Sequence, residues 1–203
     1  MFEHVLRHRD ENGELLSPHL VAVEMLNVVR PAVAIAWFVA FSAHALHRWP
    51  KSRDRLRGHD DAFARAFAHE VRRFYPFAPL MGAVARRDVP WDGDVIESGT
   101  MVLLDLFGQN HDELLWDEPY AFRPERFVGR PPGEHDLVPQ GGGDAATGHR
   151  CPGEDIVVEM LQALVPRLAR MSYDLPEQDL TIPLETVPTR PRSGVALTGV
   201  RPG

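Results

Sequence analysis

The chain has one cysteine, Cys151, in the run PQGGGDAATGHRCPGED, where a glycine-rich segment meets a predicted helix. Free backbone N–H groups and the helix dipole favour a thiolate at the N-terminus of a helix. Glycines let the backbone approach a flat cofactor closely and direct N–H groups at the sulfur. Cys151 is therefore a candidate metal ligand. The alternative interpretation is a small, buried apolar residue.

The same segment could serve nucleophilic catalysis instead. Cys151 would then be the nucleophile and His149, two residues earlier, the base, as in thiol hydrolases. Such a pair needs a third group that orients the base. The sequence identifies no such group, so the pattern favours the metal ligand.

Arg30 is the other candidate, because this charged residue stands among apolar residues at helical spacing in segment 17–49. A guanidinium binds a carboxylate through two parallel hydrogen bonds and stays charged when buried. Pro31 follows directly and would remove one helical hydrogen bond, which can kink the axis. In the alternative interpretation Arg30 pairs with an acid of the chain, such as Glu24 or Asp105.

Helices must position most of these residues. Segment 17–49, with Ser17 as the expected N-cap and Pro18 in the first turn, predicts one long, largely buried helix. Segments 60–75 and 154–171 have the same helical spacing. The second of these would begin just after Cys151.

Strands are a minority of the predicted structure. Segment 83–106 contains short runs rich in Val, Ile and Leu between Gly and Asp, which predicts a small antiparallel sheet. Segment 108–147 is rich in proline and glycine and is expected to be mostly loop, followed after the last helix by a short extended tail. The predicted fold class is mainly α with a minor β-sheet.

Two further motifs precede the cysteine. Glu70 and Arg73 form the pattern E-x-x-R in a predicted helix, and the run FRPERF at 122–127 contains Arg126. Taken alone, Glu70 and Arg73 would be a solvated ion pair three residues apart, worth only a few tenths of a kcal/mol. Their order relative to the cysteine segment is the more specific feature.

The remaining polar groups do not indicate a second site. The basic runs Arg72-Arg73 and Arg86-Arg87 are interpreted as surface or structural charge. His111-Asp112 is typical of a turn or a helix start, because no further ligands are spaced to complete a metal site with it.

Composition restricts the partners and the compartment. The formal net charge of −7 argues against a general attraction to nucleic acid or to an anionic membrane. A single cysteine excludes a disulfide within the chain and fits a reducing cytosol. The longest apolar stretch, 32–41, is about half of the roughly 20 residues that span a membrane. We expect a soluble, cytoplasmic protein.

Together the motifs resemble the C-terminal half of a cytochrome P450, with E-x-x-R, FRPERF and GHRCPGE in that family's order. The resemblance implies that Cys151 is the axial ligand of a haem iron, that His149 contacts a haem propionate and that Gly153 lies just beyond. The fold implied is the C-terminal part of the P450 fold. The resemblance also implies a buried structural network of three residues, which are Glu70, Arg73 and Arg126.

Two departures from the usual pattern resemble the fatty-acid peroxygenase branch. These are the longer insertion QGGGDAATG before the cysteine and the pair Arg30-Pro31, which replaces the acid and alcohol of most members. The resemblance implies that Arg30 holds the carboxylate of a long-chain fatty acid, with Phe77 and Leu80 lining the pocket. That carboxylate would take a proton from hydrogen peroxide and return it to the distal oxygen.

The resemblance implies haem b as the cofactor, α- or β-hydroxylation or decarboxylation as the reaction, and no redox partner protein. It covers essentially all of residues 1–203, as one partial domain, but only about half of the family's length, so the missing N-terminal half is a candidate partner. Two other functions stay open at this point. One is a truncated, non-catalytic fragment, and the other is a reductase-dependent monooxygenase.

Overall fold

Helix α2 (Pro18–Arg48) is the long helix predicted from the apolar spacing. The Ser17 side chain accepts a hydrogen bond from the Leu20 N–H at 3.2 Å, which is the expected cap, and the helix continues through Pro31. The prediction that α2 is largely buried is wrong for its first part, because Val21 is the one buried residue between Pro18 and Ala34. Helix α2 carries apolar side chains all around its axis. Their spacing therefore predicts a helix, but it does not show which face is buried.

The computed structural model describes residues 2–203, which form two units, one that ends at Trp37 and one from Phe38 to Gly203. The first unit contains α1 (Phe2–Arg7), a turn and the first part of α2. In that turn Arg9 and Leu15 form an isolated antiparallel bridge, and the Asp10 carboxylate accepts hydrogen bonds from the backbone N–H groups of Asn12 and Glu14. By length and composition α2 could also cross a membrane, a test that core helices of soluble proteins pass as well.

Two predicted helices form the centre of the second unit. They are α4 (Asp61–Phe74) and α6 (Glu154–Arg170), which pack against each other and, on one side, against α3 (Pro50–Arg57). The Asp60 carboxylate caps α4 by accepting from the Phe63 N–H at 2.9 Å. Helix α3 was not predicted as a separate element, although Pro50 at its first turn is a typical start signal.

An aromatic core joins the end of α2 to α4. Phe41 stacks on Tyr75 at 4.7 Å between ring centroids, and Phe38 lies against Phe77 at 4.8 Å. Phe38 and Phe41 are completely buried, in contrast to the exposed apolar residues earlier in α2. This core positions the turn that follows α4.

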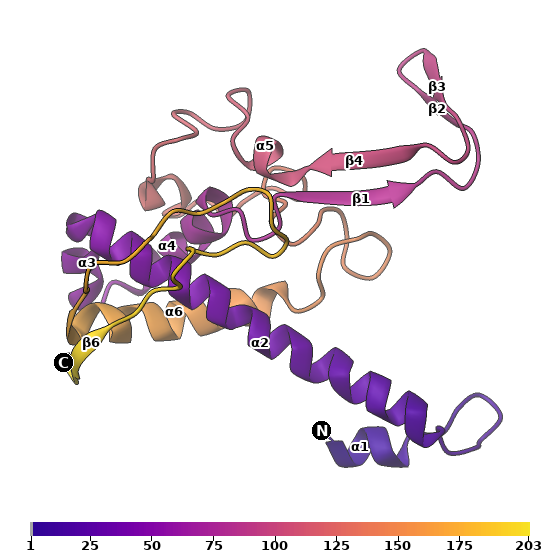
Figure 1. Ribbon diagram of the computed structural model, residues 1–203, viewed down its shortest axis with the longest axis horizontal. Helices are drawn as coiled ribbons and strands as arrows, with labels where there is room; N and C mark the ends of the chain where they lie inside the picture. Colours follow the sequence, from indigo (N-terminus) through magenta and orange to yellow (C-terminus); the bar gives the residue numbers. More distant parts are fainter. Residues whose placement is uncertain (1) are drawn as a thin grey trace. The chain divides into compact units, whose positions relative to one another are not determined.

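The strands form three separate two-stranded antiparallel sheets, so the prediction of one small sheet is wrong in its connectivity. Strand β1 (Leu80–Val84) pairs with β4 (Met101–Asp105), and β2 (Val89–Trp91) pairs with β3 (Asp94–Ile96) in a hairpin at the far end of the β1–β4 ribbon (Figure 1). The hairpin turn is Asp92-Gly93, both with positive φ, as two-residue hairpin loops require.

The remaining elements are short. Helix α5 (Leu106–Asn110) and the 3₁₀ helix η1 (Pro124–Phe127) interrupt the predicted loop region. In the tail, β5 (Ser172–Asp174) pairs with β6 (Thr198–Arg201). The fold is therefore helical with small sheets, as predicted.

Candidate functional site

The E-x-x-R pair of α4 is buried and bidentate. Both Glu70 and Arg73 have no exposed side-chain surface, and two guanidinium nitrogens of Arg73 donate to the two Glu70 oxygens at 2.9 Å each. The interpretation as a solvated surface pair is therefore wrong. The rings of Phe74 and Trp116 lie near the Arg73 guanidinium, and Trp116 comes from the segment after α5, so spacing along a single helix does not reveal the burial.

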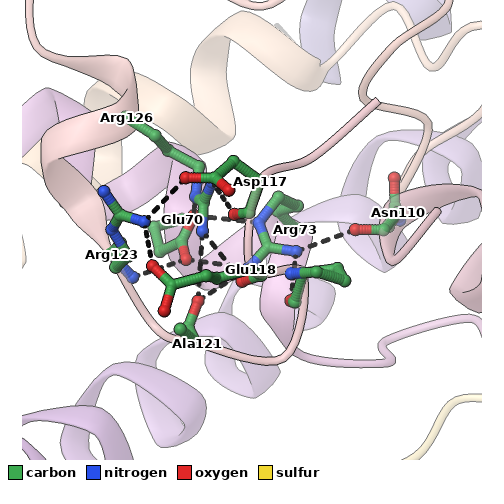
Figure 2. Close-up of polar contacts among 9 residues, drawn as sticks. Glu70, Arg73, Asn110, Asp117, Glu118, Ala121, Arg123 and Arg126 are labelled. Carbon is green, nitrogen blue, oxygen red and sulfur yellow. Dashed lines mark hydrogen bonds and ion pairs between the residues drawn. The ribbon is translucent and has the colours of Figure 1, made fainter. Parts of the chain in front are cut away.

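Arg73 uses all its N–H donors, as a buried guanidinium must. Besides Glu70 it donates to three backbone carbonyl oxygens, those of Asn110 at 2.8 Å, Pro119 at 2.8 Å and Ala121 at 3.2 Å (Figure 2). An irregular segment without its own regular hydrogen bonds is thereby fixed to α4.

Glu70 also binds the FRPERF segment. One carboxylate oxygen accepts from the Arg123 N–H at 2.7 Å, and the other lies 3.1 Å from the Arg126 Nε in an ion pair. Burial lowers the pKa of Arg126, while the Glu70 carboxylate opposes that shift. The structure thus brings Glu70, Arg73 and Arg126 together around one carboxylate (Figure 2).

The glycine-rich loop before the cysteine is tightly folded. Gly141 has φ +91, and a Cβ placed there would lie 1.9 Å from the His149 carbonyl oxygen, so only glycine fits. The insertion after it is a turn closed by Asp144, whose carboxylate accepts from the N–H groups of Ala146 and Thr147. The hydrogen bond from the Thr147 hydroxyl is the main cause of a lowered pKa at Asp144.

Cys151 follows this loop as a half-buried free thiol directly before α6. Its backbone N–H donates to the Gln140 carbonyl at 2.9 Å, and its own carbonyl accepts from the Glu154 N–H at 3.2 Å. A Cβ on Gly153 would lie 3.8 Å from the Cys151 sulfur, so the sulfur lies over the first turn of α6. The thiol therefore has the helix N-terminal position that the sequence predicted.

A second arginine of α4 is a structural charge, which is one of the two interpretations that the sequence left open. Arg72, interpreted as one of two residues of surface or structural charge, has no exposed side-chain surface and forms an ion pair with Glu154 at 2.6 Å. Its Nε donates to the Gln140 side chain at 2.9 Å. A sign was present in the sequence, because Arg72 lies within the apolar run that also buries Phe67, Ala68 and Val71.

Arg30 and Pro31 lie in the first unit and Cys151 in the second, and both residues of the pair are exposed. The two acids suggested as alternative partners of Arg30 have other contacts. Glu24 accepts from the Asn27 side chain at 3.5 Å, and Asp105 caps α5 by accepting from the Gly108 N–H at 2.7 Å. The role of Arg30 stays a prediction.

Phe77 and Leu80, the two residues expected to line a substrate pocket, follow α4 and differ in how far they are buried. Phe77 is half-buried against Phe38, and its carbonyl accepts from the Thr189 N–H at 3.1 Å. Leu80 begins β1 and is 40% exposed. Their contact with a substrate stays a prediction.

The structure of residues 2–203 gives little support to the two other interpretations, a thiol hydrolase and a metal site at His111. His149 is exposed, and within residues 2–203 its ring forms no hydrogen bond with Cys151, as a thiol hydrolase would need. His111 is buried, and its Nδ1 donates to the Phe107 carbonyl at 2.9 Å. Desolvation lowers the pKa of this ring, and no group of three metal-binding side chains occurs in the part of the chain that is described.

Comparison with known proteins agrees with the motifs. The family model for Cytochrome P450 matches residues 62–194. A curated relative, cytochrome P450 137 of Mycobacterium tuberculosis, is 29% identical over 192 residues, which are 90% of this chain and 40% of that protein.

Solved structures match more of the chain. Cytochrome P450SP alpha (CYP152B1) in complex with (R)-ibuprophen is 44% identical, with a TM-score of 0.88 over 100% of this chain and 50% of its own. A variant of cytochrome P450 OleT in complex with arachidonic acid is 39% identical, with a TM-score of 0.88 over 99% of this chain and 48% of its own. The chain thus spans about half the length of these proteins.

Proposed function

The chain belongs to the cytochrome P450 family, and from that premise we propose that it is part of a peroxygenase that oxidises long-chain fatty acids with hydrogen peroxide. Its fold corresponds to part of the P450 fold. The observation that carries the proposal is the likeness, at 39–44% identity, to two proteins of known structure, one of which binds arachidonic acid. Arg30 in α2 supplies a cation suited to such a carboxylate.

The family implies haem, and the cysteine segment fits it. A half-buried, unpaired thiol stands at the start of α6, after a loop in which Gly141 leaves no room for a side chain. We propose haem b, with Cys151 holding the iron, Gly153 beside it and His149 near a propionate. Bound in this way, haem supplies the redox chemistry that activates peroxide.

In the proposed mechanism Arg30 binds the fatty-acid carboxylate and fixes its position through paired hydrogen bonds. Held in this position, the carboxylate would be able to accept a proton from hydrogen peroxide and to donate it again, so the substrate would supply the acid–base group. Pro31 replaces the alcohol donor that the family usually has next to the acid. Because the carboxylate is fixed, oxidation would fall on the nearby carbons and give α- or β-hydroxy acids, or a terminal alkene when the carboxyl group leaves as carbon dioxide.

Other parts of the proposal follow from the same likeness. The substrates are a fatty acid and hydrogen peroxide, with Phe77 and Leu80 against the alkyl chain and no redox partner protein. Residues 1–203 form part of one P450 domain that is completed by an N-terminal half. We further propose that the protein is soluble and cytoplasmic, and that protein, not lipid, covers the exposed apolar residues of α2.

Replacing Arg30 tests the proposal. Arg30→Ala should lower kcat/KM for peroxide-driven fatty-acid oxidation by about 100-fold or more, because the carboxylate loses its fixed position. The absorption spectrum of bound haem should not change. Arg7→Ala, which removes an exposed ion pair with Glu3, is the control.

Unchanged turnover in Arg30→Ala would overturn the proposed mechanism. A requirement for a reductase in place of peroxide would favour the monooxygenase. Failure of the chain to take up haem, judged by the ferrous–carbon monoxide spectrum, would favour a non-catalytic fragment.

A further inference from the structure

Arg72 contacts both of the residues that hold the Cys151 backbone. The Cys151 N–H donates to the Gln140 carbonyl, and the Cys151 carbonyl accepts from the Glu154 N–H. The side chains of the same two residues, Gln140 and Glu154, bind one guanidinium, that of Arg72, at 2.9 Å and 2.6 Å. Through these two residues, one side chain of α4 is linked to the backbone on either side of the thiol.

The third guanidinium nitrogen of Arg72 is also engaged. Its Nη1 lies 3.2 Å from the Nδ1 of His69, and since a guanidinium can only donate, this Nδ1 must be the unprotonated, accepting nitrogen. Desolvation, together with the nearby charge of Arg72, lowers the pKa of His69 to about 3, so the ring is neutral at physiological pH. Two nitrogens of the guanidinium thus form hydrogen bonds and the third, Nη2, lies in ion-pair contact with Glu154, so contacts on three sides hold the group in one orientation.

Glu154 connects Arg72 to a second arginine. One carboxylate oxygen pairs with Arg72, and the other accepts from the Arg150 Nε at 3.1 Å. Arg150 in turn donates to the backbone carbonyls of Glu134 and Leu137 at 3.2 Å each. The cluster therefore holds the segments before and after the cysteine to α4, and it is separate from the Glu70 network.

We propose that Arg72 is a positioning residue for Cys151, and that with Gln140 and Glu154 it fixes the backbone that presents the thiol to the haem iron. The part of this inference that concerns haem rests on the proposed function. The part that concerns the cysteine backbone does not, because the contacts exist in the chain itself. The two parts can be tested separately.

Native-state amide exchange of the full chain without haem tests the backbone part. In Arg72→Met the Cys151 amide should exchange about tenfold faster, since a loosened Gln140 weakens its hydrogen bond. The Arg123 amide, which donates to Glu70 at 2.7 Å, should keep its rate. Arg72→Lys should give a smaller effect, because an ammonium can keep Glu154 but lacks the planar fork.

A matched control is available on the same helix. Arg65 of α4 pairs with Glu159 of α6 at 2.6 Å, but both side chains are largely exposed. Arg65→Met removes an ion pair between the same two helices without touching Gln140, and it should leave the Cys151 amide unchanged. If Arg72→Met does not fold, Glu154→Gln, which removes the charge and keeps the shape, should accelerate the same amide by a smaller factor.

The inference is overturned if the Cys151 amide keeps its rate in the Arg72 and Glu154 variants, or if all amides accelerate together. With haem bound, the ferrous–carbon monoxide complex of Arg72→Met should lose part of its thiolate-type Soret band, and Arg65→Met should not. A wild-type chain that binds haem without that band refutes the proposed function alone. A full thiolate-type band in both variants refutes the role of Arg72 at the haem.

Discussion

At the scale of single residues, the main feature of the site is the pairing of buried arginines with glutamates. Arg72 and Arg73 are adjacent and both fully buried, and each meets one glutamate, Glu154 or Glu70. An unpaired buried charge would be strongly destabilising, so the pairing is required for these arginines to be inside at all. Sequence alone does not assign the partners, because Glu154 lies more than eighty residues from Arg72.

His69 gives the folded chain a pH dependence. Its folded pKa of about 3 lies below the ordinary value of 6.5 because the ring is desolvated. Below pH 6.5 the unfolded chain therefore binds a proton on this histidine, whereas the folded chain binds it only near pH 3. The free energy of unfolding consequently decreases as the pH is lowered from 6.5 to about 3. At pH 5 this loss amounts to about 2 kcal/mol for one residue.

His69→Asn should reduce the loss of stability between pH 7 and pH 5, because an amide does not titrate and its oxygen can accept from Arg72. The measurement is the free energy of unfolding by urea at the two pH values. His135→Asn, which replaces an exposed histidine, is the comparison. Equal pH dependence in the wild type and in His69→Asn would show that this ring is protonated in the folded chain.

At the scale of elements, the cysteine loop depends on one glycine more than on its neighbours. Gly141 and Gly143 both have positive φ, but a Cβ on Gly141 would overlap the His149 carbonyl, whereas one on Gly143 would lie 3.8 Å from its nearest neighbour. Both positions would strain an alanine through φ, by about 1–2 kcal/mol. Only the first adds a steric clash.

Gly141→Ala should therefore lower the free energy of unfolding by more than Gly143→Ala does, and it should weaken haem uptake in a haemin titration. The difference between the two variants isolates the contact with the His149 carbonyl from the common effect of φ. Equal losses in both variants would mean that the loop shifts to accept the extra carbon.

The sequence predicted the helices well and the sheets less well. Apolar spacing and capping residues placed α2, α4 and α6 within one or two residues of their ends. The positions of the strands follow from the sequence, but their pairing depends on contacts between segments, so the sequence does not show that segment 83–106 forms two separate two-stranded sheets. Short helices such as α3 carry too few residues for a periodic pattern.

In the candidate site, too, local features could be predicted from the sequence, whereas contacts between distant segments could not. The thiol before α6 follows from Cys151 and its glycines, since these are local features. The Arg72 cluster could not be predicted, because it joins α4 to residues from two later segments. Whether a residue of the first unit such as Arg30 faces the thiol also depends on contacts that local sequence does not contain.

At the scale of the whole molecule, the β1–β4 ribbon stands out because it is apolar on both faces. Met81 pairs with Leu104 on one face, and Val84 with Met101 on the other, and all four are more than half exposed. Exposed apolar residues that gather on one surface mark sites of interaction or aggregation.

The 203-residue chain should therefore self-associate as its concentration rises, which sedimentation velocity would detect. Introducing Met81→Lys together with Leu104→Glu should weaken the association, because two exposed apolar side chains become charged. The opposite charges face each other across the strands and should keep β1 paired with β4. The double substitution leaves the net charge of the chain unchanged. Weaker association could therefore not be explained by electrostatic repulsion between whole chains. A chain that sediments as a monomer at every concentration would contradict the expectation.

Consecutive residues of an α-helix point about 100° apart around its axis. Arg72 and Arg73 therefore leave α4 in different directions, and each is bonded to a different irregular segment. A rotation of α4 about its axis would therefore disturb both sets of bonds. These bonds oppose rotation of α4. They also hold two irregular segments of the chain in fixed positions relative to the same helix.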